Sequence, residues 1–269
     1  MSKQLKIVVL AKQVPDTRNV GKDAMKEDGT VNRAALPAIF NPEDMNALEQ
    51  ALRLKEQLPN GATIELLTMG PNRAADIIRE GLFRGADGGV LLTDRKFAGA
   101  DTLATSYALA QAIRKMEPDL VLAGRQAIDG DTAQVGPQVA EKLNWPQITY
   151  AEEIKEIKEG KITVKRRLEH GIEWVSAPLP LVVTVHGSAA PCRPRHAKQL
   201  LKNKNAKVME WCVADVGGKE QQCGLTGSPT RVKKIENIVF QVKESKRINA
   251  SEQEINDLIT ELISNHTIG

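Results

Sequence analysis

The chain has 269 residues, of which 41% are hydrophobic and 26% are charged, proportions that exclude global disorder. Its formal net charge of +3 is too small to predict nucleic acid as the main partner. The three cysteines show neither a disulfide framework nor the CxxC spacing of a metal site, and the apolar runs are too short for a membrane span. We therefore expect a cytoplasmic protein with no metal and no membrane span.

Short apolar runs alternate with helical patterns in the first half of the chain. The runs, at residues 5–10, 63–70, 89–94 and 118–124, are typical of parallel strands that are buried on both faces. The helical patterns cover residues 42–58, 72–84 and 101–116, and Asn41 followed by Pro42 marks the first helix start. This alternation predicts an open α/β sheet with helices on both faces, whose ligand site lies beyond the carboxyl ends of the strands.

The pattern changes after Tyr150. Alternating residues flank Gly160 and Gly171 as in antiparallel hairpins, so we expect a mixed edge of the sheet there. From Ala189 the chain is polar, basic and interrupted by prolines until a strand-like run at 232–242 and a helix over 251–265. We expect an α/β domain over residues 1–190, and an extended C-terminal arm with a helix over 191–269.

Four turns after the expected strands combine small residues, free N–H groups and hydroxyls. They include AKQVPDT, FNPEDMNALE, TMGP and FAGADTLATS. In the first, Ala11 lets a ligand approach the backbone and Lys12 is suited to a phosphate; in the second, a helix start attracts anions although Glu43 and Asp44 already complement the helix dipole. Taken alone, these turns also have an ordinary explanation as surface turns or helix caps. Together, at one sheet edge, they predict an adenine-nucleotide site.

The turn AGRQAIDGDTAQVGP, residues 123–137, is the most informative of these segments. It lacks both the phosphate-loop lysine and the GxGxxG spacing, which argues against ATP hydrolysis and a standard nicotinamide domain. Gly124, Gly130 and Gly136 allow unusual backbone angles and close approach of a diphosphate. A tight turn stabilised by side-chain bonds of its own Asp residues is the alternative.

The two acids of this turn cannot face a phosphate at close range without a cation or a proton. We expect Asp129 or Asp131 to cap the following helix or to accept a ribose hydroxyl. Arg125 and backbone N–H groups would then meet the negative charge.

Several of these motifs resemble the β subunit of electron transfer flavoprotein. AKQVPD, FNPED and GRQAIDGDTAQVGP are similar to the nucleotide-contact loops of that family. Residues 164–184, VKRRLEHGIEWVSAPLPLVVT, resemble its signature, with His170 where the pattern usually has Gly, Asp or Glu. The resemblance covers essentially the whole chain. It implies a Rossmann-like, mostly parallel twisted sheet with helices on both faces, paired with an α subunit that binds the electron-carrying FAD.

The resemblance implies one of two cofactors in this chain. The conventional branch holds structural AMP, whereas the electron-bifurcating branch holds a second FAD that takes a hydride from NADH and sends electrons to an acyl-CoA-type dehydrogenase and to ferredoxin or flavodoxin. DGDTAQVGP, RKFAGADTLATS and GSPT resemble the bifurcating branch, and NWPQITYAEE resembles the conventional one. We expect FAD, with AMP as the alternative, and no catalytic side chain, because the cofactor carries the redox chemistry.

The expected cofactor-binding residues follow from the matching motif positions. They are Leu10, Ala11, Asn41, Met69, Asp101, Thr102, Gly124, Arg125, Gln126, Ala127, Ile128, Asp129, Gly130, Asp131, Thr132, Ala133, Gln134 and Val135.

The segment RPRHAKQLLKNKNAK, residues 193–207, contains six Lys or Arg and no acid. A cationic loop with an apolar tip suits an acidic protein surface with a small hydrophobic pocket. Nucleic acid is the rival partner, which the lack of aromatic residues disfavours. The resemblance implies a recognition loop for the partner dehydrogenase. Its expected docking residues are Arg193, Arg195, Lys198, Leu200, Leu201 and Lys202.

The C-terminal helix carries an apolar stripe at helical spacing, formed by Ile255, Leu258, Ile259, Leu262 and Ile263. We expect this stripe to pack on the α subunit, with packing on its own domain as the alternative. The rival functions are an AMP-holding shuttle subunit, a stand-alone adenine-nucleotide sensor, and an ATP-consuming ligase or hydrolase.

Overall fold

The computed structural model describes residues 4–16, 37–230, 247–249, 251–265 and 267–268. The chain divides into two compact units, Met1–Lys233 and Lys234–Gly269. The first unit therefore extends beyond residue 190, where the sequence suggested a boundary. The strand-like run at 232–242 lies outside the described residues. In the second unit, the predicted C-terminal helix is α6 (Glu252–Ser264), which begins at the N-cap Ser251, and its packing on an α subunit stays a prediction.

A nine-stranded mixed sheet forms the centre of the first unit, in the order β11-β5-β4-β1-β6-β10-β7-β8-β9. Its strands are β1 (Leu5–Leu10), β4 (Ala62–Met69), β5 (Gly88–Leu92), β6 (Leu120–Gly124), β7 (Gln147–Lys158), β8 (Lys161–Leu168), β9 (Gly171–Pro178), β10 (Leu181–Val185) and β11 (Met209–Trp211). A separate antiparallel pair consists of β2 (Gln13–Pro15) and β3 (Ala38–Phe40).

The pairing of these strands confirms the predicted α/β sheet. From β11 to β7 all neighbours are parallel, and β8 pairs antiparallel with both β7 and β9, so the expected mixed edge is present. The order also contains two features that the sequence pattern did not show. The fully buried β10 is a central strand between β6 and β7, and β11 from the basic half of the chain extends the other edge.

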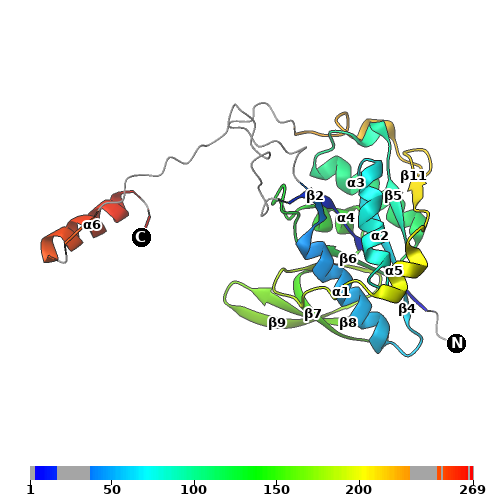
Figure 1. The fold of residues 1–269 in the computed structure, drawn as a ribbon, viewed down its shortest axis with the longest axis horizontal. Helices are drawn as coiled ribbons and strands as arrows, with labels where there is room; N and C mark the ends of the chain where they lie inside the picture. Colours follow the sequence, from blue (N-terminus) through cyan, green and yellow to red (C-terminus); the bar gives the residue numbers. More distant parts are fainter. Residues whose placement is uncertain (1–3, 17–36, 231–246, 250, 266, 269) are drawn as a thin grey trace. The chain divides into compact units, whose positions relative to one another are not determined.

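Helices cover both faces of the sheet. They are α1 (Pro42–Gln57), α2 (Ala75–Leu82), α3 (Thr102–Met116), α4 (Val135–Leu143) and α5 (Ala197–Asn203), with short 3₁₀ turns at Asn72–Ala74, Arg95–Phe97 and Glu220–Gln222. One apolar core joins α1 and α2 to their side of the sheet, and a second joins α3 and α4 to the other. Figure 1 shows this layered arrangement. The segment expected to be a basic loop thus contains a short helix, α5.

The strand order reverses direction around β1. After β1 the chain moves to β4 on one side, and after β6 it moves through α4 to β7 on the other. A crevice is therefore expected where the connections diverge, beyond the carboxyl ends of β1 and β6. In the described part of the chain, no helix is long and apolar enough to cross a membrane.

Candidate functional site

A cavity of about 410 Å³ lies at the carboxyl ends of β1, β4 and β6, a size within the range of small-molecule pockets. Fifteen of the eighteen expected cofactor residues line this cavity. The three that do not are Asn41, Ile128 and Asp129. The lining residues outside the list of expected cofactor residues are Lys12, Asp44, Leu67, Phe97, Gly99, Ala100, Thr105, Leu109, Ala123 and Gly136. Buried apolar side chains of the strand ends and α3 thus face polar groups of the 124–134 loop.

Asn41 does not line the cavity but binds the loop that does. Its fully buried side chain donates from Nδ2 to the carbonyl oxygen of Gln126 at 2.9 Å and accepts from the backbone N–H of Ile128 at 3.2 Å. Asn41 occupies the N-cap position of α1, yet its side chain makes no capping bond. The simple helix cap considered from the sequence is therefore wrong, because the amide satisfies loop atoms that are more than eighty positions away.

Glu43 engages the loop next to Asn41. One carboxylate oxygen lies 3.0 Å from Nη2 of Arg125, and the other accepts from the backbone N–H of Gln126 at 3.0 Å. The guanidinium of Arg125 also lies 5.7 Å from the ring centre of Tyr150. Arg125 was expected to meet the charge of a ligand, but its own charge is already paired with Glu43. Its Nε is buried and has no hydrogen-bond partner among the described residues.

Asp44 connects three elements beneath the cavity. It is buried, and it accepts from the backbone N–H groups of Lys12 at 2.8 Å and Gly124 at 3.0 Å. It thereby joins α1 to the ends of β1 and β6. Burial raises the pKa of Asp44 to about 7, against hydrogen bonds that favour the charged form. A Cβ on Gly124 would lie 2.4 Å from Oδ1 of Asp44, so this contact requires glycine.

The loop between Gly130 and α4 has an unusual backbone. The left-handed angles fall on Asp131 (φ 47°) and Ala133 (φ 53°), and not on the glycines as we expected. Such angles cost non-glycine residues about 1–2 kcal/mol each, and they cluster at functional sites. The backbone N–H groups of Thr132, Ala133 and Gln134 have no hydrogen-bond partner among the described residues. Amides that are free in a turn of this kind form an anion-binding concavity.

The two acids of the loop have partners inside the protein. Asp131 accepts from Nε2 of Gln126 at 2.8 Å, and Asp129 forms an ion pair with Nζ of Lys12 at 2.7 Å. Neither caps α4, whose N-cap residue Gln134 makes no side-chain capping bond. The expected capping role is therefore wrong, because both carboxylates bond side chains outside the helix start.

The start of α3 forms the wall opposite this loop. Asp101 caps α3 by accepting from the backbone N–H of Ala104 at 3.0 Å, and it also accepts from the hydroxyl of Thr230 at 2.7 Å. Thr102 donates to Oε1 of Gln134 at 2.9 Å, which links α3 to the loop. The GSPT segment thus helps to position a helix start that lines the cavity.

This lining fits a ligand with a flat apolar part and an anionic part. The apolar walls suit a ring system, and the unpaired amides at residues 132–134 suit a phosphate. Gly130 has open space around its Cα, with nothing within 4 Å of a built Cβ. An adenine nucleotide has both parts. Among the described residues, no group of three or more His, Cys, Asp or Glu is placed to hold a metal ion.

Comparison with known proteins agrees with this geometry. Residues 28–216 match the electron transfer flavoprotein domain. The chain is 47% identical over 238 residues to the electron transfer flavoprotein subunit beta of Megasphaera elsdenii, covering 86% of this chain and 87% of that protein. The chain belongs to the electron transfer flavoprotein β-subunit family. The predicted resemblance is thus confirmed, and with it a role in flavin-related electron transfer.

Other relatives in this family carry more specific names. The chain is 45% identical over 229 residues to the caffeyl-CoA reductase-Etf complex subunit CarD of Acetobacterium woodii, covering 85% of this chain and 86% of that protein. It is 40% identical over 278 residues to the acryloyl-CoA reductase electron transfer subunit gamma of Anaerotignum propionicum, covering 98% and 100% of the two chains.

The basic segment of this electron transfer flavoprotein chain divides into two parts. Its first part is tied to the domain, because Arg193 contacts Glu49 at 3.0 Å and also pairs with Glu56, while Arg195 pairs with Glu80 at 2.5 Å. Two of the six expected docking residues are therefore already engaged in ion pairs.

The second part of the segment is α5. Lys198, Leu201 and Lys202 lie three and four positions apart, so they share one side of the helix. Leu201 is 76% exposed, whereas Leu200 is half-buried. Of the two leucines expected at the apolar tip, Leu201 is the exposed one, and the docking role of the segment stays a prediction.

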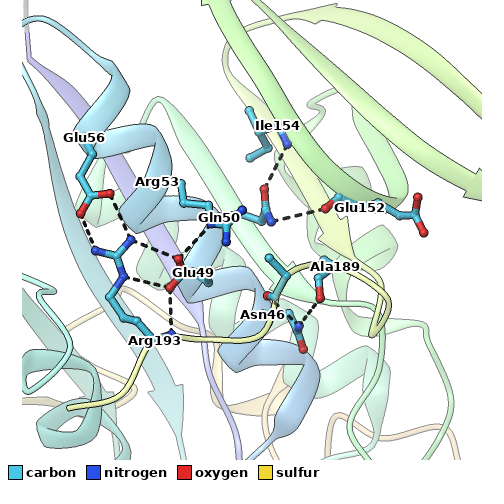
Figure 2. A network of polar contacts seen from close by, with 10 residues as sticks. Asn46, Glu49, Gln50, Arg53, Glu56, Glu152, Ile154, Ala189 and Arg193 are labelled. Carbon is cyan, nitrogen blue, oxygen red and sulfur yellow. Dashed lines mark hydrogen bonds and ion pairs between the residues drawn. The ribbon is translucent and has the colours of Figure 1, made fainter.

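Polar side chains of α1 hold the strand and the segment that lie beside it, as Figure 2 shows. Asn46 donates to the carbonyl oxygens of Ala189 and Ala190 at 2.9 and 3.0 Å. Gln50 accepts from the backbone N–H of Ile154 at 3.1 Å. The chain leading to α5 is thus fixed to α1 before α5 begins.

Proposed function

We propose that this chain is the β subunit of a heterodimeric electron transfer flavoprotein that binds FAD in the cavity described above. The heterodimer would take electrons from NADH and pass them to an acyl-CoA-type dehydrogenase and to a low-potential acceptor such as ferredoxin or flavodoxin. The observation that carries this proposal is the cavity at the β1 and β6 ends, with three unpaired amides at its phosphate side. Membership of the family supplies the electron-transfer role.

The residues of this chain would bind and orient the cofactor. Bound FAD supplies hydride acceptance and one-electron chemistry. The amides of residues 132–134 would receive the diphosphate, and the apolar walls around Leu10 and Phe97 would hold the adenine. Asn41, Glu43 and Asp44 keep the loop at the distance from β1 that this fit requires.

A CoA-ester oxidoreductase is the proposed protein partner. The names of two relatives, from a caffeyl-CoA reductase complex and an acryloyl-CoA reductase, support this class. Leu201 would enter an apolar pocket of the partner, while Lys198 and Lys202 meet acidic residues around it. Replacing Leu201 by Ser should slow electron delivery at least tenfold without changing flavin content. The half-buried Leu200 provides the matched control, because its replacement should act mainly through stability.

AMP is the second candidate ligand. It is favoured by NWPQITYAEE at residues 144–153, which resembles the conventional branch. In that case the same cavity holds a structural nucleotide, and the electrons use only the flavin of the α subunit. A stand-alone sensor and an ATP-consuming enzyme lose support, because the chain belongs to a family of electron-transfer subunits.

Cofactor content decides between these candidates. The chain is co-purified with its α subunit, and flavin and adenylate are measured per heterodimer after acid release. Two FAD support the proposal, and one FAD with one AMP supports the second candidate. A heterodimer with flavin on the α subunit but no nucleotide in this chain would refute both assignments of the cavity.

A further inference from the structure

Lys12 lies between the end of β1 and the loop at 124–135. Its backbone N–H donates to Asp44 at 2.8 Å, which fixes the start of the side chain. Its Nζ contacts both carboxylate oxygens of Asp129, at 2.7 and 2.8 Å. Lys12 lines the cavity, whereas Asp129 does not. The ammonium group is therefore held at a carboxylate that lies outside the pocket lining.

Two cations line the cavity within the described part of the chain, and their ion pairs differ in burial. Arg125 is paired with Glu43, whose side chain is only 13% exposed and also binds the Gln126 amide. The Lys12 side chain is 49% exposed and its pair with Asp129 has no further side-chain partner among these residues. Exposed ion pairs of this kind contribute little stability, so breaking one costs little free energy. Lys12 is thus the cation that is free to change partner.

We propose that Lys12 is the phosphate ligand of the cavity and that Asp129 is its resting partner. When a nucleotide binds, the ammonium group leaves Asp129 and binds phosphate oxygens beside the amides of residues 132–134. The phosphate of AMP, or the two phosphates of the FAD diphosphate together, carries more negative charge and more acceptor oxygens than one carboxylate, so the exchange favours the bound state. Asp129 therefore lowers nucleotide affinity by competing for Lys12. This inference rests on the proposed function, since it requires a phosphate-bearing ligand.

The competition makes the two residues act in opposite directions. Lys12→Met should weaken AMP binding about tenfold, a typical effect of losing one charge-assisted hydrogen bond. Asp129→Asn should tighten it about threefold, because Lys12 no longer has a competing carboxylate partner. The double variant should bind like Lys12→Met, since Asp129 acts only through the lysine. A purely structural brace would instead make both single variants weaker.

Calorimetric titration of the full chain, freed of bound nucleotide, tests this with AMP and adenosine. Adenosine lacks the phosphate, so all variants should bind it as the wild type does, which also shows that they are folded. Lys12→Arg keeps the charge and should retain AMP binding. Unchanged AMP affinity in Lys12→Met, or a loss of affinity in Asp129→Asn, would overturn the inference alone. A wild-type chain that binds neither AMP nor FAD would overturn the proposed function as well.

Discussion

The buried carboxyl group of Asp44 gives a pH-dependent stability that Asp44→Asn should remove. Burial raises the pKa of this group from 3.8 to about 7 in the folded chain. Between these values the folded protein holds a proton that the unfolded chain has lost. The contribution of this group to the free energy of unfolding is therefore complete below pH 4, and it is lost as the pH rises to 7.

The size of the effect follows from the shift of the pKa. A change of about 3 pKa units, from 3.8 to about 7, corresponds to about 4 kcal/mol at about 1.4 kcal/mol per unit. The difference in unfolding free energy between wild type and Asp44→Asn isolates the contribution of Asp44, because all other groups titrate equally in the two proteins. That difference should fall by about 4 kcal/mol between pH 4 and pH 8. Asparagine has one acceptor oxygen, so one of the two amides now bonded by Asp44 loses its partner at every pH.

Urea unfolding of the full chain, followed by tryptophan fluorescence at several pH values, measures this difference. Glu152→Gln is a control of opposite sign. A hydrogen bond from Ser188 and the Arg167 guanidinium lower the pKa of Glu152 to about 2. The contribution of Glu152 to the free energy of unfolding is present above its unfolded pKa and is lost as the pH falls towards 2. The difference in unfolding free energy between wild type and Glu152→Gln therefore rises with pH. A difference for Asp44 that is flat, or that rises with pH, would refute the reasoning.

Two further pairs of substitutions test the supports of the cavity and of the segment leading to α5. Gly124→Ala should destabilise the chain by about 1–3 kcal/mol and prevent nucleotide binding, because the new Cβ would displace Asp44. Gly130→Ala, with open space around it, should leave urea unfolding unchanged, and equal losses of stability in both variants would contradict the close contact at Gly124. Arg193→Met leaves the 5% exposed Glu49 short of a partner and should cost about 2 kcal/mol in urea unfolding. Arg195→Met, at an exposed pair, should cost less than about 1 kcal/mol, and the reverse order would be evidence against a buried brace.

The sequence pattern was sufficient for features that depend on local order. β1, β4, β5 and β6 are buried on both faces, so their apolar runs were visible, and the long helices carried regular spacing and start signals. The 123–137 turn was found for the same reason, because its small residues follow a strand directly. Family motifs then located most of the cavity lining, which composition alone could not do.

The remaining features depend on contacts between distant parts of the chain. Asp44 and Gly124 are 80 positions apart, and Arg193 and Glu49 are 144 apart. No local pattern indicates that an acid in a helix start will accept the amide of a later strand. The place of β10 between β6 and β7 was not predicted, because the order of strands in a sheet is set by the packing of the whole domain.

Helix α1 supports both proposed sites and thereby fixes one relative to the other. Its start holds the nucleotide loop through Glu43 and Asp44, and its later turns hold the segment leading to α5 through Asn46 and Glu49. A helix of 16 residues is about 24 Å long and rigid along its axis. Electron transfer depends on fixed distances between a cofactor and its partner. If the loop binds the cofactor and the segment docks the partner as proposed, their shared support keeps that distance constant, because both are bonded to the same helix.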